Sequence, residues 1–504
     1  MSYHLNPKIY LVPFYVLIEY LSHRDLIRLS HVDPFFKNEI YHKTKGFSHK
    51  VHCLKFSKIL TETFKNVRFE LDKHDLITQM DPTNISKLWI YPEKEISPRS
   101  LLLMKNLTDL TLWHNIPPAI YIKHLPMLKT LSLYAHNLMT DEHLLNLTNL
   151  TCLKFMEQSY NLDRQPGITD AGLGKLINLN HLRLDLDNDR ITDDSIRKLS
   201  NLTYLLIIGN NHISDSSIEN LKSLKKITLY LTINITGASL LKLPDLEELN
   251  LYQGVNITDD SLIFLTNLKA LSLYIGVNIS DRSLIYLTNL THLCICESRE
   301  ITDISLSKLI NLETFMLSGY NKCTADSFKC LTGLKSLHLN YTVSTSDNDL
   351  RSLTHLTHLD IMGPMNITDA LLETFINLKS LKLWLSESTK VTSKCLKNLG
   401  RLEDLQIYGN IIYENDIRHL TNLTKLNLMG GKYVRGGGLP GRSNLTSLEI
   451  SCQMESTFNG PKLFPDIESC NVGSSCCYCN DEENWKCIKF VLFVMIVGLI
   501  IIFV

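Results

Sequence analysis

The sequence predicts an α/β solenoid, a stack of short units that each contain one strand and one short helix. The first observation is a repeat of the form L-x-x-L-x-L, which starts sixteen times between Leu107 and Leu445. The second is its period, because eight successive intervals between Leu202 and Leu378 are 22 residues long. The third is a recurring Ile-Thr-Asp in the second half of the unit. A period in the twenties is typical of stacked repeats.

The first half of a unit predicts a strand with one apolar face. In the unit that begins at Leu246, Leu249 and Leu251 lie two residues apart and therefore point to the same side of a strand. Glu248, Asn250 and Tyr252 point to the other side. One unit cannot bury its apolar row alone, so neighbouring units must stack.

The second half of a unit predicts a helical turn. Thr258 or Asp259 can accept hydrogen bonds from the first backbone N–H groups of a helix, as an N-cap does. Leu262 and Leu265 follow at helical spacing and face inward. The same string recurs at residues 168–170, 191–193, 301–303 and 367–369, and with serine for threonine at 213–215 and 279–281.

These residues resemble the leucine-rich repeat family over roughly residues 60–452, with about 16–18 repeats if weaker units begin at Phe64 and Ile85. The resemblance implies a right-handed curved solenoid, with a parallel sheet on the concave face and short helices on the convex face. The second half of the unit is similar to the cysteine-containing subclass common in F-box proteins. The unit here is shorter, however, and its regular cysteine is missing.

The charge composition gives no sign of nucleic-acid binding. The chain has 51 basic and 52 acidic residues among 504, whereas a nucleic-acid-binding domain has a basic excess. A solenoid grows by adding units, so this length is compatible with one continuous core.

Residues 7–42, which precede the repeats, predict two helices joined by a turn near Ser22. They resemble the second half of an F-box, although Pro13 lies about three residues too late for the opening of that motif. The resemblance implies binding to a Skp-type adaptor of a cullin-RING ubiquitin ligase. The residues that would contact the adaptor are Leu17, Tyr20, Leu21, Leu26, Leu29, Val32 and Phe36. Two alternatives are a helical cap on the first repeat and a signal peptide, since Ile9–Ile18 is apolar but lacks a cleavage site after it.

The C-terminal residues 488–504 form an apolar run that predicts a transmembrane tail. Trp485, Lys486 and Lys489 suit the interface with lipid head groups. We expect the repeats on the cytoplasmic side, and the short run favours the endoplasmic reticulum or the outer mitochondrial membrane. Residues 453–487 predict a cysteine-rich linker, whose spacing favours palmitoylation over zinc binding.

No catalytic, cofactor or metal site is predicted. Gly436–Ser443 has the spacing of a phosphate-binding loop but carries Arg442 in place of its lysine. His292, Cys294 and Cys296 alternate along one strand, and the neighbouring strands add nothing that completes a zinc site. We therefore expect a protein that is not an enzyme.

The outward-facing end of each strand is rich in aromatic residues. Eight of the sixteen residues that lie six positions after a lead residue, from Tyr91 to Met429, are Tyr or Trp. Such exposed rows anchor partner proteins, but they also arise from stacking between strands. The predicted partner-binding residues are Trp113, Tyr134, Tyr230, Tyr252, Tyr274, Trp384 and Tyr408.

The sequence thus favours a non-catalytic substrate-recognition subunit of an F-box-type ubiquitin ligase, tethered to a membrane and holding a protein on its concave face. One alternative is a lumenal or extracellular repeat receptor with a C-terminal anchor, in which sequons such as Asn256-Ile257-Thr258 would carry glycans. The other is a structural interaction scaffold.

Overall fold

The computed structural model describes residues 48–51, 68–71, 83, 85–90, 98–113, 122–134, 139–156, 167–185, 190–340, 345–363, 366–384, 390–409, 417–429, 445–451 and 469–473. The F-box-like segment 7–42 and the apolar run 488–504 lie outside these residues. The chain divides into two compact units, residues 1–331 and residues 332–504. Among the described residues, no helix combines the length and the apolar character that a bilayer crossing requires.

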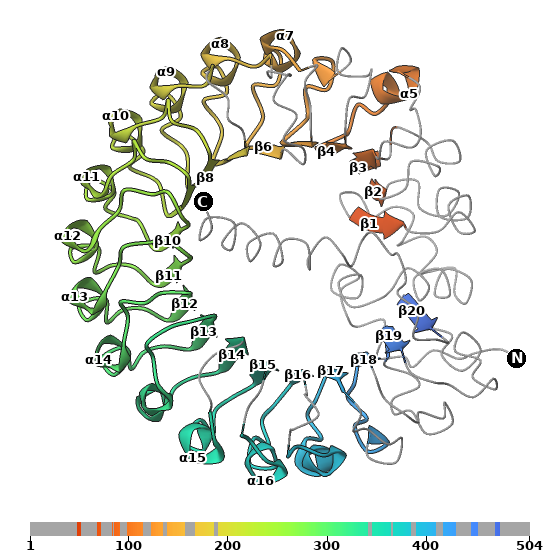
Figure 1. The fold of residues 1–504 in the computed structure, drawn as a ribbon. Coiled ribbons are helices and arrows are strands. Elements are labelled where there is room, and N and C mark those ends of the chain that lie inside the picture. The colour runs from red at the N-terminus through yellow and green to blue at the C-terminus, as the bar shows by residue number, and fades with distance from the viewer. Residues whose placement is uncertain are drawn as a thin grey trace, which may run out of the picture. The chain divides into compact units, whose positions relative to one another are not determined.

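The first unit is a stack of parallel strands with short helices on its outer side (Figure 1). Its strands are β1 Ser48–Val51, β2 Arg68–Leu71, β3 Ile85–Ile90, β4 Asp109–Trp113, β5 Thr130–Tyr134, β6 Cys152–Met156, β7 His181–Asp185, β8 Tyr204–Ile208, β9 Lys226–Tyr230, β10 Glu248–Leu251, β11 Ala270–Leu273, β12 His292–Cys296 and β13 Thr314–Ser318. Its helices are α5 Pro98–Leu103, α7 Asp141–Leu144, α8 Asp170–Leu173, α9 Asp193–Ile196, α10 Asp215–Ile218, α11 Gly237–Leu240, α12 Asp259–Leu262, α13 Asp281–Leu284, α14 Asp303–Leu306 and η4 Ala325–Cys330.

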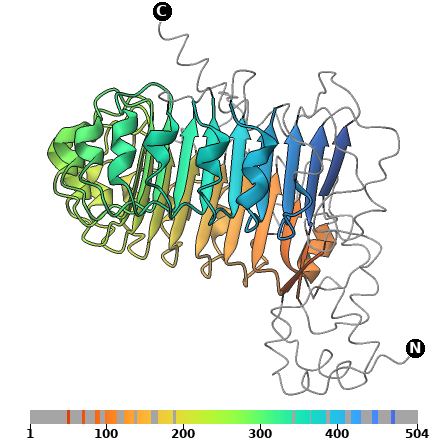
Figure 2. The same cartoon turned by 90° about the horizontal axis from the view of Figure 1, so that it is seen from below.

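The second unit repeats the arrangement, and its strands lie side by side (Figure 2). Its elements are β14 Ser336–Asn340, α15 Asp347–Leu350, β15 His358–Met362, α16 Asp369–Leu372, β16 Ser380–Trp384, η5 Ser393–Asn398, β17 Asp404–Tyr408, β18 Lys425–Met429, β19 Ser447–Ser451 and β20 Ser469–Gly473. The predicted α/β solenoid of stacked strand–helix units is confirmed in both units.

Successive strands from β9 to β13 pair residue for residue, and the repeats that carry them are all 22 residues long. The first residues of these strands lie opposite one another in turn: Lys226, Glu248, Ala270, His292 and Thr314. In strands β3 to β18 alternate residues point into the core, and Leu249, for example, is 0% exposed. The predicted alternation between a buried and an outward face is therefore confirmed.

The stack extends beyond residues 60–452. Strand β1 pairs with β2, and β20 pairs with β19 within the segment 453–487 that the sequence predicts as a linker. In β20, Cys470 and Val472 lie opposite Leu448 and Ile450. A strand without either leucine of the L-x-L pattern is invisible to a search for the repeat.

Each helix from α7 onward begins at a threonine or serine N-cap, as the Ile-Thr-Asp string predicts. The Thr192 hydroxyl, for instance, accepts from the backbone N–H of Asp194 at 3.2 Å. The aspartate after the N-cap makes a further contact that the sequence analysis missed. Its carboxylate bonds to the N-cap residue of the next repeat, so that Asp170 accepts from the Thr192 N–H at 2.9 Å and from its hydroxyl at 2.6 Å.

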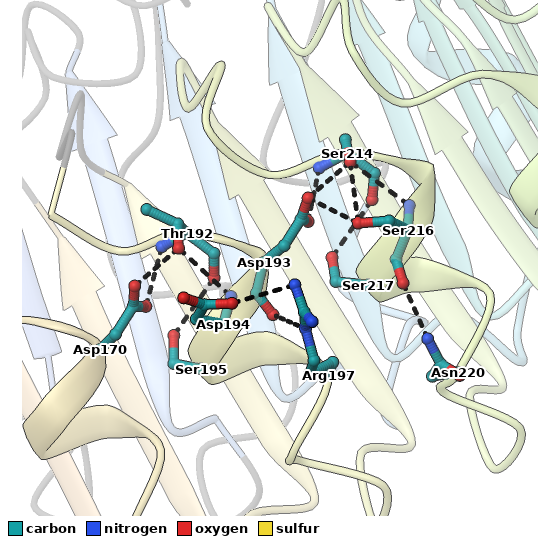
Figure 3. A network of polar contacts seen from close by, with 10 residues as sticks. All are labelled: Asp170, Thr192, Asp193, Asp194, Ser195, Arg197, Ser214, Ser216, Ser217 and Asn220. Atoms are coloured by element: carbon teal, nitrogen blue, oxygen red, sulfur yellow. Dashed lines mark hydrogen bonds and ion pairs between the residues drawn. The ribbon is translucent and has the colours of Figure 1, made fainter.

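This aspartate ladder joins successive repeats on the side of the helices (Figure 3). Its rungs in the first unit are Asp141–Thr169, Asp170–Thr192, Asp193–Ser214, Asp215–Thr236, Asp259–Ser280, Asp281–Thr302 and Asp303–Thr324, and in the second unit Asp347–Thr368 and Asp369–Thr392. Burial alone would raise the pKa of Asp170. Hydrogen bonds from Ser195 and Thr192 outweigh it and hold that pKa below its ordinary value.

The ladder is interrupted between α11 and α12. Gly237 occupies the aspartate position there, and the side chain of Thr258 makes no cap hydrogen bond. A Cβ atom added to Gly237 would lie 1.9 Å from the Cβ of Ser261. The two repeats therefore approach each other too closely at this point for an aspartate to fit unless one of them shifts.

A second set of bonds lies at the start of the strands, where many repeats read Asn-Leu-Thr. The Asn289 amide donates to the Thr266 carbonyl of the preceding repeat at 2.9 Å, and the Thr291 hydroxyl donates to the Lys269 carbonyl at 3.1 Å. These bonds join neighbouring repeats, and the Lys269 carbonyl also accepts from the backbone N–H groups of Thr291 and His292. They give the frequent Asn-Leu-Thr strings a structural reason.

Candidate functional site

The outward-facing row of aromatic side chains is the candidate binding surface, and it lies on the concave face of each unit. The equal register of the strands places rings of adjacent repeats directly opposite one another, as with Trp113 and Tyr134. Their centroids are 3.8 Å apart and their planes differ by 5°. The Tyr252 and Tyr274 rings stack in the same way, at 3.9 Å and 5°.

The row is not uniform along its length. Tyr230 meets Tyr252 edge to face, with centroids 5.7 Å apart and planes at 77°. In the second unit Trp384 stacks on Tyr408 at 4.0 Å. All seven predicted partner-binding side chains lie in this row and are half-buried. The structure therefore shows stacking between strands, which the sequence analysis gave as the alternative to partner binding. Because the side chains are only half-buried, part of each ring remains accessible to a partner.

Burial changes the chemistry of the tyrosine hydroxyls in this row. It raises the pKa of Tyr252 and of Tyr274, and the latter is raised further by its neighbour Cys294. These phenols stay neutral at physiological pH. They can act as hydrogen-bond donors to a partner but not as bases.

A second aromatic contact lies at the other end of the strands and was missed by the sequence analysis. The His181 ring stacks on Tyr204 with centroids 4.0 Å apart, and the Lys226 ammonium lies 5.4 Å from the Tyr204 centroid. Burial, together with the charges of Lys154, Lys226 and Arg183, lowers the pKa of His181 to about 4. His181 and Tyr204 each lie two positions after the lead leucine of their repeat. A comparison of the residues at that position, in addition to those six positions after the lead leucine, would have found this pair.

We predict that His181 makes the repeats less stable in mild acid. A histidine with a lowered folded pKa is protonated mainly in the unfolded state, so its contribution is complete above pH 6.5 and is lost as pH falls toward about 4. Replacing His181 by Phe keeps a ring against Tyr204 and removes the titration. The slope of unfolding free energy against pH between 4 and 6.5 should flatten relative to wild type in urea titrations. An unchanged slope would contradict the assignment.

Arg183 and Asp185 form a polar pair on the same concave surface. The Arg183 guanidinium donates to the Asp185 carboxylate at 2.6 Å. Burial raises the pKa of Asp185 although Arg183 opposes this shift. Arg183 Nε and Asp185 Oδ1 are both buried without a hydrogen-bond partner among the described residues. The pair therefore makes this part of the concave face polar without leaving a free charge.

The cysteine-rich strand β12 gives no sign of nucleophilic or metal chemistry. Burial and the neighbouring Cys296 raise the pKa of Cys294 to about 12, so this thiol stays protonated. Burial also raises the pKa of Cys296. In the part of the chain that the structure describes, no three His, Cys, Asp or Glu side chains gather as a metal site.

The second unit has a shallow hollow of about 490 Å³ on its concave face, lined by polar and charged side chains that include His338, His358, Asp360, Lys382, Asp404 and Lys425. Beside it, Ser336 Oγ lies 2.9 Å from His338 Nε2, and His338 Nδ1 lies 3.5 Å from Asp360 Oδ2. The second distance is too long for the hydrogen bond that orients a catalytic histidine. A central sheet strand such as β15 also commits its N–H groups to its neighbours and offers no oxyanion hole. We interpret the grouping as a polar surface.

The chain was compared with known proteins. No protein-family model and no curated protein matches it. Among solved structures, an internalin (inlF) of Listeria monocytogenes is 23% identical with a TM-score of 0.39, and the match covers 68% of this chain and 91% of that one. The TLR13–ssRNA13 complex gives 17% identity and a TM-score of 0.42, covering 84% of this chain and 66% of the other.

The Toll–Spätzle complex of Drosophila gives 15% identity and a TM-score of 0.39, covering 82% of this chain and 66% of the other. This chain thus spans about two thirds of the length of either Toll-type chain. At such low identity and TM-score the fold assignment depends on the repeat geometry itself. The parallel strands and short helices described in each unit fit a leucine-rich repeat solenoid.

Proposed function

We propose that this chain is a non-catalytic receptor that holds a protein partner on its concave face. The observation that carries the proposal is the row of stacked, half-buried Tyr and Trp rings. Tyr and Trp contribute large contact area at little entropic cost, and rings already held by stacking lose little further freedom on binding.

Replacing Tyr230, Tyr252 and Tyr274 together by Ser is expected to weaken partner binding by about 2–4 kcal/mol if these rings are hot spots. The stacked rings also stabilise the sheet by about 0.5–1.5 kcal/mol per pair, so part of the loss would appear in folding stability. The measurement is recovery of crosslinked partners from a cell lysate by full-length protein, with circular dichroism to confirm folding.

The matched control replaces the same three tyrosines by Phe, which keeps the rings and removes the hydroxyls. We expect the Phe variant to retain most of the partner. Equal recovery with the Ser variant and with wild type would mean that the row serves stacking alone.

The finer part of the proposal is that the receptor belongs to an F-box-type ubiquitin ligase. Its support is the pattern of residues 7–42, in which Leu21, Leu26 and Leu29 would form the apolar contact with a Skp-type adaptor. The receptor would act by proximity, since it brings the bound protein to the ligase and performs no chemistry.

Leu26→Asp is expected to abolish co-precipitation of the adaptor and the cullin, because it places an unpaired charge where the contact must exclude water. The repeats should remain folded, since the substitution changes none of the residues of the described strands and helices. Leu26→Met is the control and should keep adaptor binding. A wild-type chain that never retrieves adaptor or cullin would remove the ubiquitin proposal and leave a protein-binding scaffold.

We further propose that residues 488–504 tether the chain to a membrane with the repeats on the cytoplasmic side. The competing proposal is a lumenal or extracellular receptor with the same anchor. Protease digestion of intact microsomes separates the two, because cytoplasmic repeats are digested and lumenal repeats are protected. Glycan-dependent mobility shifts would favour the lumenal receptor.

A further inference from the structure

Three adjacent helices of the first unit expose a group of apolar side chains on the convex face. They are the fifth residue counted from the start of α11 and the fifth and sixth residues counted from the start of α12 and of α13. Leu241 is 44% exposed, Phe264 68% and Tyr286 51%. Ile263 and Ile285 lie between them and are partly exposed. We call these five residues the convex patch.

The repeat itself does not require apolar residues at these positions. In α8, α9, α10 and α14 the same two positions carry Gly174 and Lys175, Arg197 and Lys198, Glu219 and Asn220, and Ser307 and Lys308. Those helices pack into the same solenoid with polar residues at these sites. The convex patch is therefore a local departure from the repeat, and contiguous exposed apolar side chains of this kind mark an interaction surface.

Lysines lie on both sides of the convex patch. Lys175, Lys198 and Lys242 precede it and Lys308 follows it, all at the sixth position of their helices and all exposed. None of the four forms an ion pair with any described residue, whereas Arg197 is paired with Asp194 and Arg282 with Asp260. Glu219 is the acidic residue at the corresponding positions of α8–α14. At these two positions the surface is thus apolar at its centre and basic at its edges, and the exposed Asp260 of α12 is paired with Arg282.

We infer that the convex patch docks on an anionic membrane surface. Phe and Tyr settle at the level of the head groups together with the leucine and isoleucine side chains beside them, while lysine stems extend so that their ammonium groups reach lipid phosphates. Each lysine near an anionic leaflet adds attraction. A stable protein interface uses roughly 20–30 residues per partner, far more than this surface offers. The inference does not depend on the concave partner, and a membrane tether at residues 488–504 would hold the patch near such a surface.

The experiment uses the full chain and reads out lipid contact locally. Protein is mixed with phosphatidylcholine vesicles, with or without phosphatidylserine, that contain a photoactivatable phospholipid, and adducts are mapped by mass spectrometry. On phosphatidylserine vesicles we expect adducts on residues 259–290. The double substitution Phe264→Ser and Tyr286→Ser should lower them about tenfold or more, because it removes most of the apolar contact.

Two comparison variants test the components of the surface. Ile310→Ser removes a side chain that is 63% exposed but lies outside the patch, and adducts should persist. Lys242→Glu with Lys308→Glu should lower adducts on phosphatidylserine vesicles and make the remainder insensitive to salt. Circular dichroism confirms that each variant is folded.

Several outcomes would overturn the inference. Adducts confined to residues 488–504 would mean that only the tail meets lipid. Adducts on residues 259–290 that survive Phe264→Ser and Tyr286→Ser would mean incidental proximity. A dimer in analytical ultracentrifugation that these substitutions dissolve, without lipid adducts, would assign the patch to a second copy of the chain. Loss of the concave partner has no bearing on any of these results.

Discussion

Replacing Asp193 by Ala is expected to lower the free energy of unfolding by about 2–4 kcal/mol, because it removes several hydrogen bonds to a charged group at once. The carboxylate accepts from the Ser214 N–H at 2.8 Å, from the Ser214 hydroxyl at 2.6 Å and from the Ser216 hydroxyl at 2.7 Å (Figure 3). The alanine variant would remove the acceptor of the part-buried Ser214 N–H and hydroxyl, whereas the exposed Ser216 hydroxyl could bond to water. Urea denaturation measures the loss, and hydrogen exchange should show it first in α9 and α10.

Asp194 provides a matched control one residue away. Its side chain is 70% exposed and pairs with Arg197 at 3.0 Å. An exposed pair of this kind contributes little, so Asp194→Ala should cost less than about 0.5 kcal/mol. Equal losses at the two aspartates would show that the ladder does not couple the repeats.

Replacing Phe315 by Ala is expected to cost about 3–5 kcal/mol, the range for deleting a buried aromatic side chain. Phe315 is fully buried in β13 and lies 6.2 Å, centroid to centroid, from the equally buried Phe328 of η4. The cavity would separate a strand from the helix that covers it. Urea denaturation with the matching change in hydrogen exchange of β12 and β13 measures the effect.

The neighbouring Met316 points to the opposite side of the same strand and is 38% exposed. Met316→Ala should therefore cost less than about 1 kcal/mol. A larger loss at Met316 than at Phe315 would contradict the assignment of the two faces of the sheet.

The fold could be predicted from the sequence because its two periods, the 22-residue spacing and the alternation within each strand, are visible in the order of the leucines. Leu249 and Leu251 show the buried face directly, and Thr258 shows where a helix begins. The aspartate ladder was missed because its bonds join residues about 21 positions apart, such as Asp193 and Ser214. A reading of one repeat explains the threonine but cannot show which neighbour the aspartate reaches.

The candidate site could be predicted only in part. Tyr252 and Tyr274 could be predicted because both lie six positions after the lead leucine of their repeat. Since neighbouring strands pair without a shift, their rings had to be adjacent. Their parallel stacking, and the edge-to-face contact of Tyr230, depend on rotamers that the residue order does not determine. The convex patch was missed for another reason. Phe264 and Tyr286 occupy a helix position that carries lysine in α8, α9 and α14. Only their exposure in the structure distinguishes them from core residues.

The equal register of β9 to β13 has a consequence for how such a chain can change over generations. Unequal recombination between two copies of the repeat in the gene would delete or add a block of 22 residues and leave each remaining strand opposite an equivalent residue. The aspartate of one repeat would again meet a threonine or serine of the next. A lineage could therefore lengthen or shorten its recognition surface one strand at a time without a new core. The exceptions are repeats whose helix does not begin with aspartate, as at Gly237.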